Sequence, residues 1–233
     1  MAGRRDFFVT GTDTGVGKTL AAAALLRAWR LTGQRVAGMK PVASGAAVTP
    51  GGLRNDDAQA LAAESSDDWP YGLVNPYAFE PPIAPHLAAA EAGVTIRVDP
   101  LRQAFQALQA ASDVVVVEGA GGFLVPLGPG LSFADLPTAL GLEVILVVGL
   151  RLGCLNHALL TAEAIGRRSL PLAGWIGNLA EPAFDRLEAN LDTLHRALDA
   201  PCIGLIGHLD PPDAGTAARA LTALPALATR ELD

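Results

Sequence analysis

The chain has 233 residues, of which 50% are hydrophobic and 18% charged, and its formal net charge is −7. This length fits one α/β domain, the hydrophobic fraction excludes intrinsic disorder, and the negative charge excludes a basic face for nucleic acid. No apolar run approaches the ~18 residues of a membrane span, the N-terminus predicts no secretory signal, and two cysteines, Cys154 and Cys202, predict a reducing cytoplasm.

Short β-rich runs alternate with longer Ala- and Leu-rich stretches. Several runs are unbroken and apolar, as strands buried on both faces require. The alternation predicts an α/β fold, a doubly wound and mostly parallel sheet with helices on both faces, in one domain over residues 1–233. The expected strands are Asp6–Thr10, Arg35–Lys40, Val114–Glu118, Val144–Val148, Leu172–Asn178 and Cys202–Ile206. The expected helices are Gly17–Thr32, Asp56–Glu64, Asp99–Ala111, Phe133–Leu140, Leu155–Arg168 and Ala183–Leu198.

Two stretches rich in small residues and proline interrupt this pattern, Ser44–Asn55 and Asp67–Pro85. Because the periodicity resumes on both sides of each, we expect long loops over one sheet, where ligand-binding groups usually lie. The Ala-rich segment after Asp210 gives no clear element.

The first expected strand runs directly into a glycine-rich loop, Gly11–Thr19, which ends in Gly-Lys-Thr and opens a helix. This context is typical of a phosphate-binding loop, whose backbone N–H groups surround phosphate oxygens. Lys18 is expected to reach the β- and γ-phosphates and the Thr19 hydroxyl to bind Mg²⁺. The spacing departs from the common motif, since Thr12 stands where its first glycine is expected.

Lysine is rare in this chain, because Lys18 and Lys40 are the only two and every other cationic side chain is an arginine. Because arginine is used at every other cationic position, each lysine predicts a site that needs a compact point charge. Lys40 ends the second expected strand, at the sheet edge where ligands bind, and can offset charge on a transferred phosphoryl group. Ser44, in the loop that follows, is a candidate hydrogen-bond donor.

Carboxylates are predicted at the same edge. Glu118 follows four valines and precedes Gly-Ala-Gly-Gly, so it marks the carboxyl end of a buried strand. Asp56 and Asp57 come directly after Asn55. We expect one of these two acids to cap the helix and the other to be free for Mg²⁺, and the residues alone leave the choice open.

Several motifs together resemble the dethiobiotin synthetase family. They run in family order along most of the chain and comprise Gly11–Thr19, Lys40–Gly45, Leu53–Asn55, Val74–Tyr77, Val117–Gly122, Leu152–Ala158 and Ala173–Ile176. The resemblance implies a P-loop NTPase-like fold and a homodimer of biotin biosynthesis. It also implies an ATP- and Mg²⁺-dependent ligase that closes a cyclic urea from 7,8-diaminononanoate and CO₂, through a carbamate and a carbamic-phosphoric anhydride.

The resemblance further implies a role for each matching residue. Lys18 and Lys40 would be catalytic, and Thr19, Asp57 and Glu118 would hold Mg²⁺, which selects Asp57 over Asp56. The substrate would be bound by Thr14 and Ser44, and by Gly153, Cys154, Leu155 and Asn156 of the other subunit. The cofactor would be bound by Gly15, Val16, Gly17, Lys18, Thr19, Leu20, Asp57, Glu118, Gly119, Ala120, Gly121, Asn178, Gly207, His208 and Leu209.

Departures from the family pattern concern the nucleotide base. Gly15, Leu179 and the pair Gly207-His208 differ from some members, so the resemblance does not fix base preference.

One alternative function is an amidotransferase-type ligase of a related cofactor pathway, which would need a glutaminase partner or domain. Another is a nucleotide-switch ATPase of the partitioning type, which would carry a second lysine early in the loop. Neither a nucleic-acid nor a membrane partner is expected.

Overall fold

The computed structural model describes residues 6–224, at whose centre lies a six-stranded parallel sheet in the order β12-β11-β10-β1-β7-β2. The expectation of no secretory signal rests mainly on residues 1–5, which lie outside this range. The strands of the sheet are β1 (Phe7–Gly11), β2 (Val36–Met39), β7 (Val114–Gly122), β10 (Glu143–Gly149), β11 (Leu172–Asn178) and β12 (Cys202–Ile206). This arrangement confirms the predicted α/β fold class.

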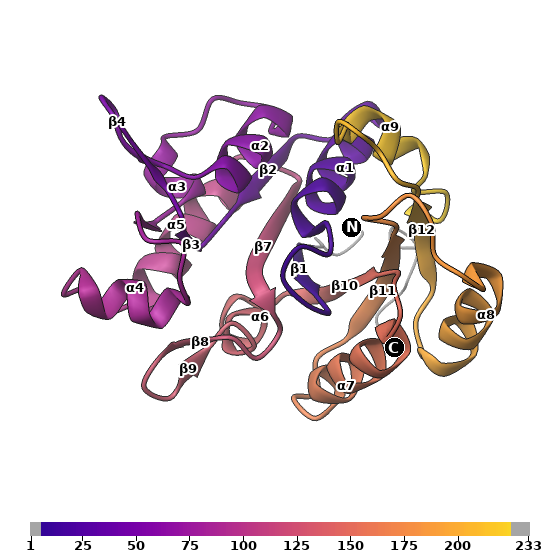
Figure 1. Ribbon diagram of the computed structural model, residues 1–233. Coiled ribbons are helices and arrows are strands. Elements are labelled where there is room, and N and C mark those ends of the chain that lie inside the picture. The colour runs from indigo at the N-terminus through magenta and orange to yellow at the C-terminus, as the bar shows by residue number, and fades with distance from the viewer. Residues whose placement is uncertain (1–5, 225–233) are drawn as a thin grey trace.

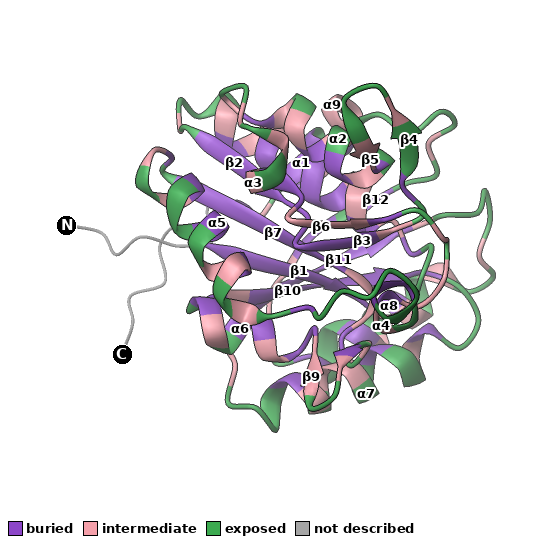
Figure 2. Cartoon of the chain, turned by 90° about the vertical axis from the view of Figure 1, so that its left-hand side faces the viewer, coloured by how far each residue is buried: buried purple, intermediate pink, exposed green. Residues whose placement is uncertain are grey.

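Helices cover both faces of the sheet (Figures 1 and 2). Val114 and Val116 pack on one face with α1, α2 and α9, whereas Val115 and Val117 pack on the other with α5 and α6. Helices α7 and α8 extend this second layer over β10 and β11. The helices are α1 (Lys18–Leu31), α2 (Asp56–Glu64), α3 (Tyr71–Val74), α4 (Pro85–Glu91), α5 (Val98–Ala110), α6 (Asp135–Leu140), α7 (Cys154–Gly166), α8 (Leu187–Ala197) and α9 (Ala214–Arg219). Within residues 6–224, none of them has the length and apolar character needed to cross a membrane.

Every predicted strand and helix is present. The bounds of α2, β11 and β12 are those predicted, whereas the other elements have shifted ends. Strand β7 continues to Gly122 instead of ending at Glu118. Helix α8 begins at Leu187 and not at Ala183, because Arg186 before it has a left-handed backbone (φ 58°) that interrupts a helix. Within the Ala-rich segment after Asp210, residues 214–219 form α9, and residues 225–233 lie outside the described range.

The prediction of two long loops is wrong in part. The first contains the hairpin of β4 (Ala47–Thr49) and β5 (Gly52–Arg54), which projects at one edge of the molecule (Figure 1). The second contains α3 and β6 (Tyr77–Phe79), and β6 pairs in parallel with β3 (Val42–Ser44). A further short ladder joins β8 (Pro126–Gly128) to β9 (Leu131–Ser132). Elements this short show no readable periodicity.

The topology places the candidate site at one sheet edge. Strand β1 lies between β10 and β7, the point from which chain connections diverge and beside which ligands bind in such sheets. The glycine-rich loop follows β1 and must turn sharply at Gly17, whose φ is 87°. A Cβ at Gly17 would lie 2.2 Å from Nδ2 of Asn178, so only glycine fits there.

Candidate functional site

A cavity of about 1080 Å³ lies at the carboxyl ends of β1, β2 and β7. The glycine-rich loop, the start of α2 and the loop before α4 form its walls. The structure brings together there many residues that the sequence singled out. They are Thr14, Gly15, Gly17, Lys18, Thr19, Leu20, Lys40, Ser44, Asp57, Glu118, Ala120 and Gly121.

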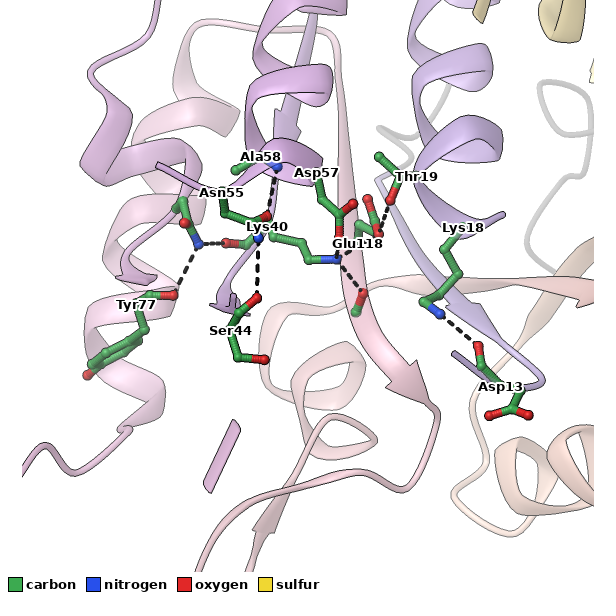
Figure 3. A network of polar contacts seen from close by, with 12 residues as sticks. Asp13, Lys18, Thr19, Lys40, Ser44, Asn55, Asp57, Ala58, Tyr77 and Glu118 are labelled. Carbon is green, nitrogen blue, oxygen red and sulfur yellow. Dashed lines mark hydrogen bonds and ion pairs between the residues drawn. The ribbon is translucent and has the colours of Figure 1, made fainter. Parts of the chain in front are cut away.

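Lys40 is the centre of a polar cluster in this cavity (Figure 3). Its side chain is only 3% exposed, and its Nζ donates hydrogen bonds to Asp57 Oδ2 at 2.7 Å and to Glu118 Oε1 at 2.7 Å. A third bond, of 3.1 Å, goes to the carbonyl of Gly119. The Thr19 hydroxyl donates to the same Oε1 of Glu118 at 2.9 Å. Residues from α1, α2 and β7, and the residue directly after β2, thus converge on one point.

The charges in this cluster control one another's protonation. Burial lowers the pKa of Lys40, but the Glu118 and Asp57 carboxylates outweigh burial and leave this pKa raised. Burial raises the pKa of Asp57, but the Lys40 ammonium outweighs it and leaves this pKa lowered. For the fully buried Glu118, burial prevails over Lys40 and the pKa is raised. A further cation beside Glu118 would therefore favour its ionised form.

The oxygen atoms around Glu118 fit Mg²⁺. The second carboxylate oxygen of Glu118, Oε2, is buried and has no hydrogen-bond partner. With the Thr19 hydroxyl and the Asp57 carboxylate it gives the hard oxygen donors that Mg²⁺ prefers when nucleotide phosphates complete its shell. Residues 6–224 hold no group of three or more His, Cys, Asp or Glu side chains suited to a metal. The oxygens of Thr19, Asp57 and Glu118 fit a Mg²⁺ ion whose remaining ligands come from nucleotide phosphates.

Asn55 caps helix α2, and the prediction that Asp56 or Asp57 does so is wrong. The Asn55 backbone is extended (φ −107°, ψ 135°), and its side chain accepts a hydrogen bond from the N–H of Ala58. Both acids lie in the first turn, where they complement the positive end of the helix dipole. Asp56 is exposed, whereas Asp57 pairs with Lys40, so Asp57 is the acid of the cluster.

Lys18 bends back over its own loop, where its Nζ donates to the Asp13 carbonyl at 2.8 Å (Figure 3). Burial, and next the charge of Lys40, lower the pKa of Lys18 to about 8. The free protein therefore holds this lysine partly neutral near pH 8, whereas a bound phosphate favours the charged form.

Nucleotide affinity is expected to fall about tenfold between pH 7 and pH 9, because above its free-state pKa Lys18 must take up a proton on binding. Calorimetric titration of ADP without metal checks this. At pH 9, buffers of different ionisation enthalpy should also report proton uptake. A dissociation constant that does not change with pH, without proton uptake, would contradict the assignment of Lys18 to the phosphates.

The remaining predicted residues lie outside the large cavity. The carbonyl of Val16 accepts a hydrogen bond from Nδ2 of Asn178 at 3.0 Å, so the end of β11 contacts the glycine-rich loop. Gly207, His208 and Leu209 follow β12, and Nδ1 of His208 lies 3.0 Å from the carbonyl of Ala180. The start of α7, comprising Gly153, Cys154, Leu155 and Asn156, does not line the cavity of its own chain.

Sequence reasoning missed part of the cavity wall. Most of the missed residues are small or apolar and gave no signal, apart from the proline-rich composition of Asp67–Pro85; Glu64 is the charged exception. The missed lining residues are Ala23, Ala43, Ala60, Ala63, Glu64, Pro82, Ile83, Ala84, Pro85, Val125, Pro212 and Ala214.

Known proteins resemble the chain in sequence and in fold. A family model described as an AAA domain matches residues 5–214. An ATP-dependent dethiobiotin synthetase BioD from Aromatoleum aromaticum is 51% identical over 95% of this chain and 98% of its own length. The enzyme of that name from Pseudomonas paraeruginosa is 55% identical over 91% of this chain and 92% of its own length.

Solved structures that resemble the chain are more distant in sequence. The septum site-determining protein MinD of Pyrococcus horikoshii, in complex with Mg-ADP, has a TM-score of 0.56 at 18% identity and covers 96% of this chain and 94% of its own. A ParA family ATPase from Chlorobium tepidum has a TM-score of 0.56 at 13% identity and covers 98% of this chain and 95% of its own. At these identities the likeness shows the P-loop NTPase-like fold alone.

Proposed function

The chain belongs to the ATP-dependent dethiobiotin synthetase family, and we propose that it is an ATP- and Mg²⁺-dependent ligase that closes the cyclic urea of dethiobiotin. One amine of 7,8-diaminononanoate adds to CO₂ and gives a carbamate. A carbamate oxygen attacks the γ-phosphorus of ATP, and ADP leaves. The second amine then attacks the carbonyl carbon of the carbamic-phosphoric anhydride, which expels phosphate and closes a five-membered ring.

The observation that carries this proposal is that the only two lysines of the chain line one cavity together with Thr19, Asp57 and Glu118. Phosphorylation of a carbamate joins two anions, and the buried cations offset their repulsion by roughly 3 kcal/mol each. Lys18 and the N–H groups of its loop bind the β- and γ-phosphates, and Lys40 binds the carbamate and the transferred group. Mg²⁺, when held by Thr19, Asp57 and Glu118, supplies further positive charge on the phosphate oxygens.

Substrate positions follow from the same cavity. Thr14 and Ser44 bind the diamine end, and the apolar wall of Pro82, Ile83 and Val125 suits an aliphatic chain. Asn178 and the segment 207–209 contact the nucleotide on the side of β11 and β12. This part of the proposal is supported by the hydrogen bond from Asn178 to the glycine-rich loop.

The proposal extends to the state of the protein in the cell. We propose one domain over residues 1–233, a homodimer whose two sites are each completed by the other copy, and a cytoplasmic location. The free thiols of Cys154 and Cys202 support a reducing compartment.

Purified protein incubated with 7,8-diaminononanoate, bicarbonate and Mg-ATP is expected to yield the cyclic urea, measured by mass spectrometry, with one ADP per product. Omission of the diamine or of bicarbonate should stop ADP release. Absence of the cyclic urea beside robust ATP hydrolysis without diamine would contradict the proposal and favour a switch ATPase.

Glu118→Gln is expected to lower the affinity for Mg²⁺ in the nucleotide complex by about 10- to 100-fold. Nucleotide binding should then depend less on Mg²⁺, and turnover should fall. The replacement is nearly isosteric, and its amide oxygen can still accept from Thr19 and Lys40, so the fold should survive. Titration of ADP affinity against Mg²⁺ checks this, and the exposed Glu188→Gln is the matched control. A stability change with an unaltered Mg²⁺ dependence would overturn the assignment.

A further inference from the structure

The backbone of Lys40 is held on both sides by the residues that end helix α3. Its N–H donates to the carbonyl of Val74 at 2.7 Å, and its carbonyl accepts from Nδ2 of Asn75 at 2.7 Å. Asn75 is only 3% exposed. Its Nδ2 also donates to the carbonyl of Tyr77 at 3.1 Å, and its Oδ1 accepts from the Tyr71 hydroxyl at 3.1 Å. Both polar atoms of this buried amide are therefore bonded.

The same series of bonds continues to the start of α2, which carries Asp57. The Tyr71 hydroxyl accepts from the N–H of Asn55 at 2.8 Å. The Asn55 side chain in turn accepts from the N–H of Ala58 at 3.2 Å and donates to the carbonyl of Ser44 at 3.4 Å (Figure 3). The guanidinium of Arg54 lies 4.2 Å from the centre of the Tyr71 ring and restrains it.

These bonds close a ring with the polar cluster of the cavity. The ring runs from the Lys40 carbonyl through Asn75, Tyr71 and Asn55 to the first turn of α2, and returns from Asp57 to Lys40 Nζ. Figure 3 shows the Lys40 side chain directed toward Asp57 and Glu118, while the hydrogen bond of its backbone carbonyl lies on the opposite side. Lys40, Asn55 and Asn75 are buried, and Tyr71 and Asp57 are partly buried. A hydrogen-bond network of this kind, with its bonds made, favours one geometry.

We propose that Asn75 and Tyr71 are positioning residues, which set the place of Lys40 relative to Asp57. This inference rests on the proposed function in one respect only, namely that Lys40 acts on the reacting groups. Nζ of Lys40 has three acceptors within the protein, and it must release at least one of them to bind a substrate oxygen. The backbone bonds to Val74 and Asn75 then hold the lysine at the site. About 1 Å of misplacement can lower a rate by about 10²-fold. Loss of these bonds is therefore expected to lower turnover much more than nucleotide affinity.

Tyr71→Phe tests this inference with little change in shape. It removes the hydroxyl that Asn55 and Asn75 share but keeps the ring beside Arg54. We expect kcat to fall by at least about tenfold while the KM for ATP stays within about twofold, since the phosphate-binding loop is untouched. Tyr77→Phe is the matched control, because its hydroxyl accepts from the N–H of Arg97 at 3.3 Å, outside the ring of bonds.

A second readout needs no turnover. Protein labelled with ¹³C-lysine gives Cε signals from Lys18 and Lys40 alone, since the chain has no other lysine. Tyr71→Phe should shift or broaden the Lys40 signal and leave that of Lys18 in place, and Tyr77→Phe should move neither. Asn75→Asp, which places a carboxylate against two carbonyls, should have the larger effect on Lys40. If Asn75→Asp fails to fold, the Lys40 signal of Tyr71→Phe alone tests the positioning role.

The outcomes separate this inference from the proposed function. If the wild-type protein forms no cyclic urea, the proposed function fails, and the lysine signals alone decide the positioning role. The inference is overturned if the Lys40 signal of Tyr71→Phe matches wild type, or if Tyr71→Phe lowers the melting temperature while kcat of an active enzyme stays unchanged. In a Lys40→Arg background, Tyr71→Phe should lower the residual rate no further, because it acts through Lys40.

Discussion

Lys40→Arg is expected to lower kcat/KM by at least about 10²-fold, nearly as far as Lys40→Ala, which corresponds to about 2.7 kcal/mol of transition-state stabilisation. The buried Lys40 ammonium bonds to three acceptors that converge on it, at 2.7, 2.7 and 3.1 Å. A guanidinium is larger and planar, and it cannot direct its donors at three converging oxygens as a compact ammonium does. The positive charge remains, but it moves away from the reacting oxygens.

Stability separates the two substitutions. Lys40→Ala leaves the fully buried Glu118 without its cation, which is expected to lower the free energy of unfolding by about 3–5 kcal/mol. The concentration of folded protein is therefore measured by ADP binding before the rates of the variants are compared. The control is Arg35→Lys, the opposite exchange in an exposed ion pair with Asp67, for which kcat/KM should change by less than about twofold. Near-normal turnover of Lys40→Arg would show that any cation serves at this position.

The part of the site that the sequence predicted belongs to long buried strands. The glycine-rich loop follows β1, Lys40 comes directly after β2, and Glu118 lies in the middle of β7. The apolar pattern of these strands is readable, and parallel strands end at the same edge of a sheet. Their side chains could therefore be expected at one site, although not the 2.7 Å contact between Lys40 and Glu118.

The part that the sequence did not predict depends on contacts between distant backbone and side-chain atoms. Asn75 is bonded to the carbonyl of Lys40, 35 positions away, and a carbonyl has the same chemistry in every residue. Helix α3 has four residues and strand β6 three, too few to reveal a period. The cap of α2 was missed for another reason, because Asn and Asp are equally good caps and Asn55 precedes two aspartates.

The start of helix α7 supports a site completed by a second copy. Leu152, just before α7, is 94% exposed, and Leu159 and Leu160 on α7 are also exposed. A second copy could cover such exposed leucines. Gly153 has a left-handed backbone (φ 94°), and a Cβ built on it would meet no atom within 4 Å. The N–H of Cys154 donates to the carbonyl of Arg151 at 3.0 Å. First-turn N–H groups that a helix leaves unbonded attract a carboxylate. Because this segment does not line the cavity of its own chain, we expect it to bind the substrate carboxylate in the other copy.

A mixture of two inactive variants is expected to recover about a quarter of wild-type activity if the sites are shared in this way. One variant is Lys40→Arg, and the other is Gly153→Glu, whose negative charge would repel the carboxylate. Random reassortment makes about half of the dimers mixed, and each mixed dimer has both lesions in one site and none in the other. Gly153→Asn controls for the left-handed backbone, which asparagine tolerates without adding charge. Sites built from a single chain would give no recovery in verified mixed dimers, and a fully active monomer would likewise exclude a shared site.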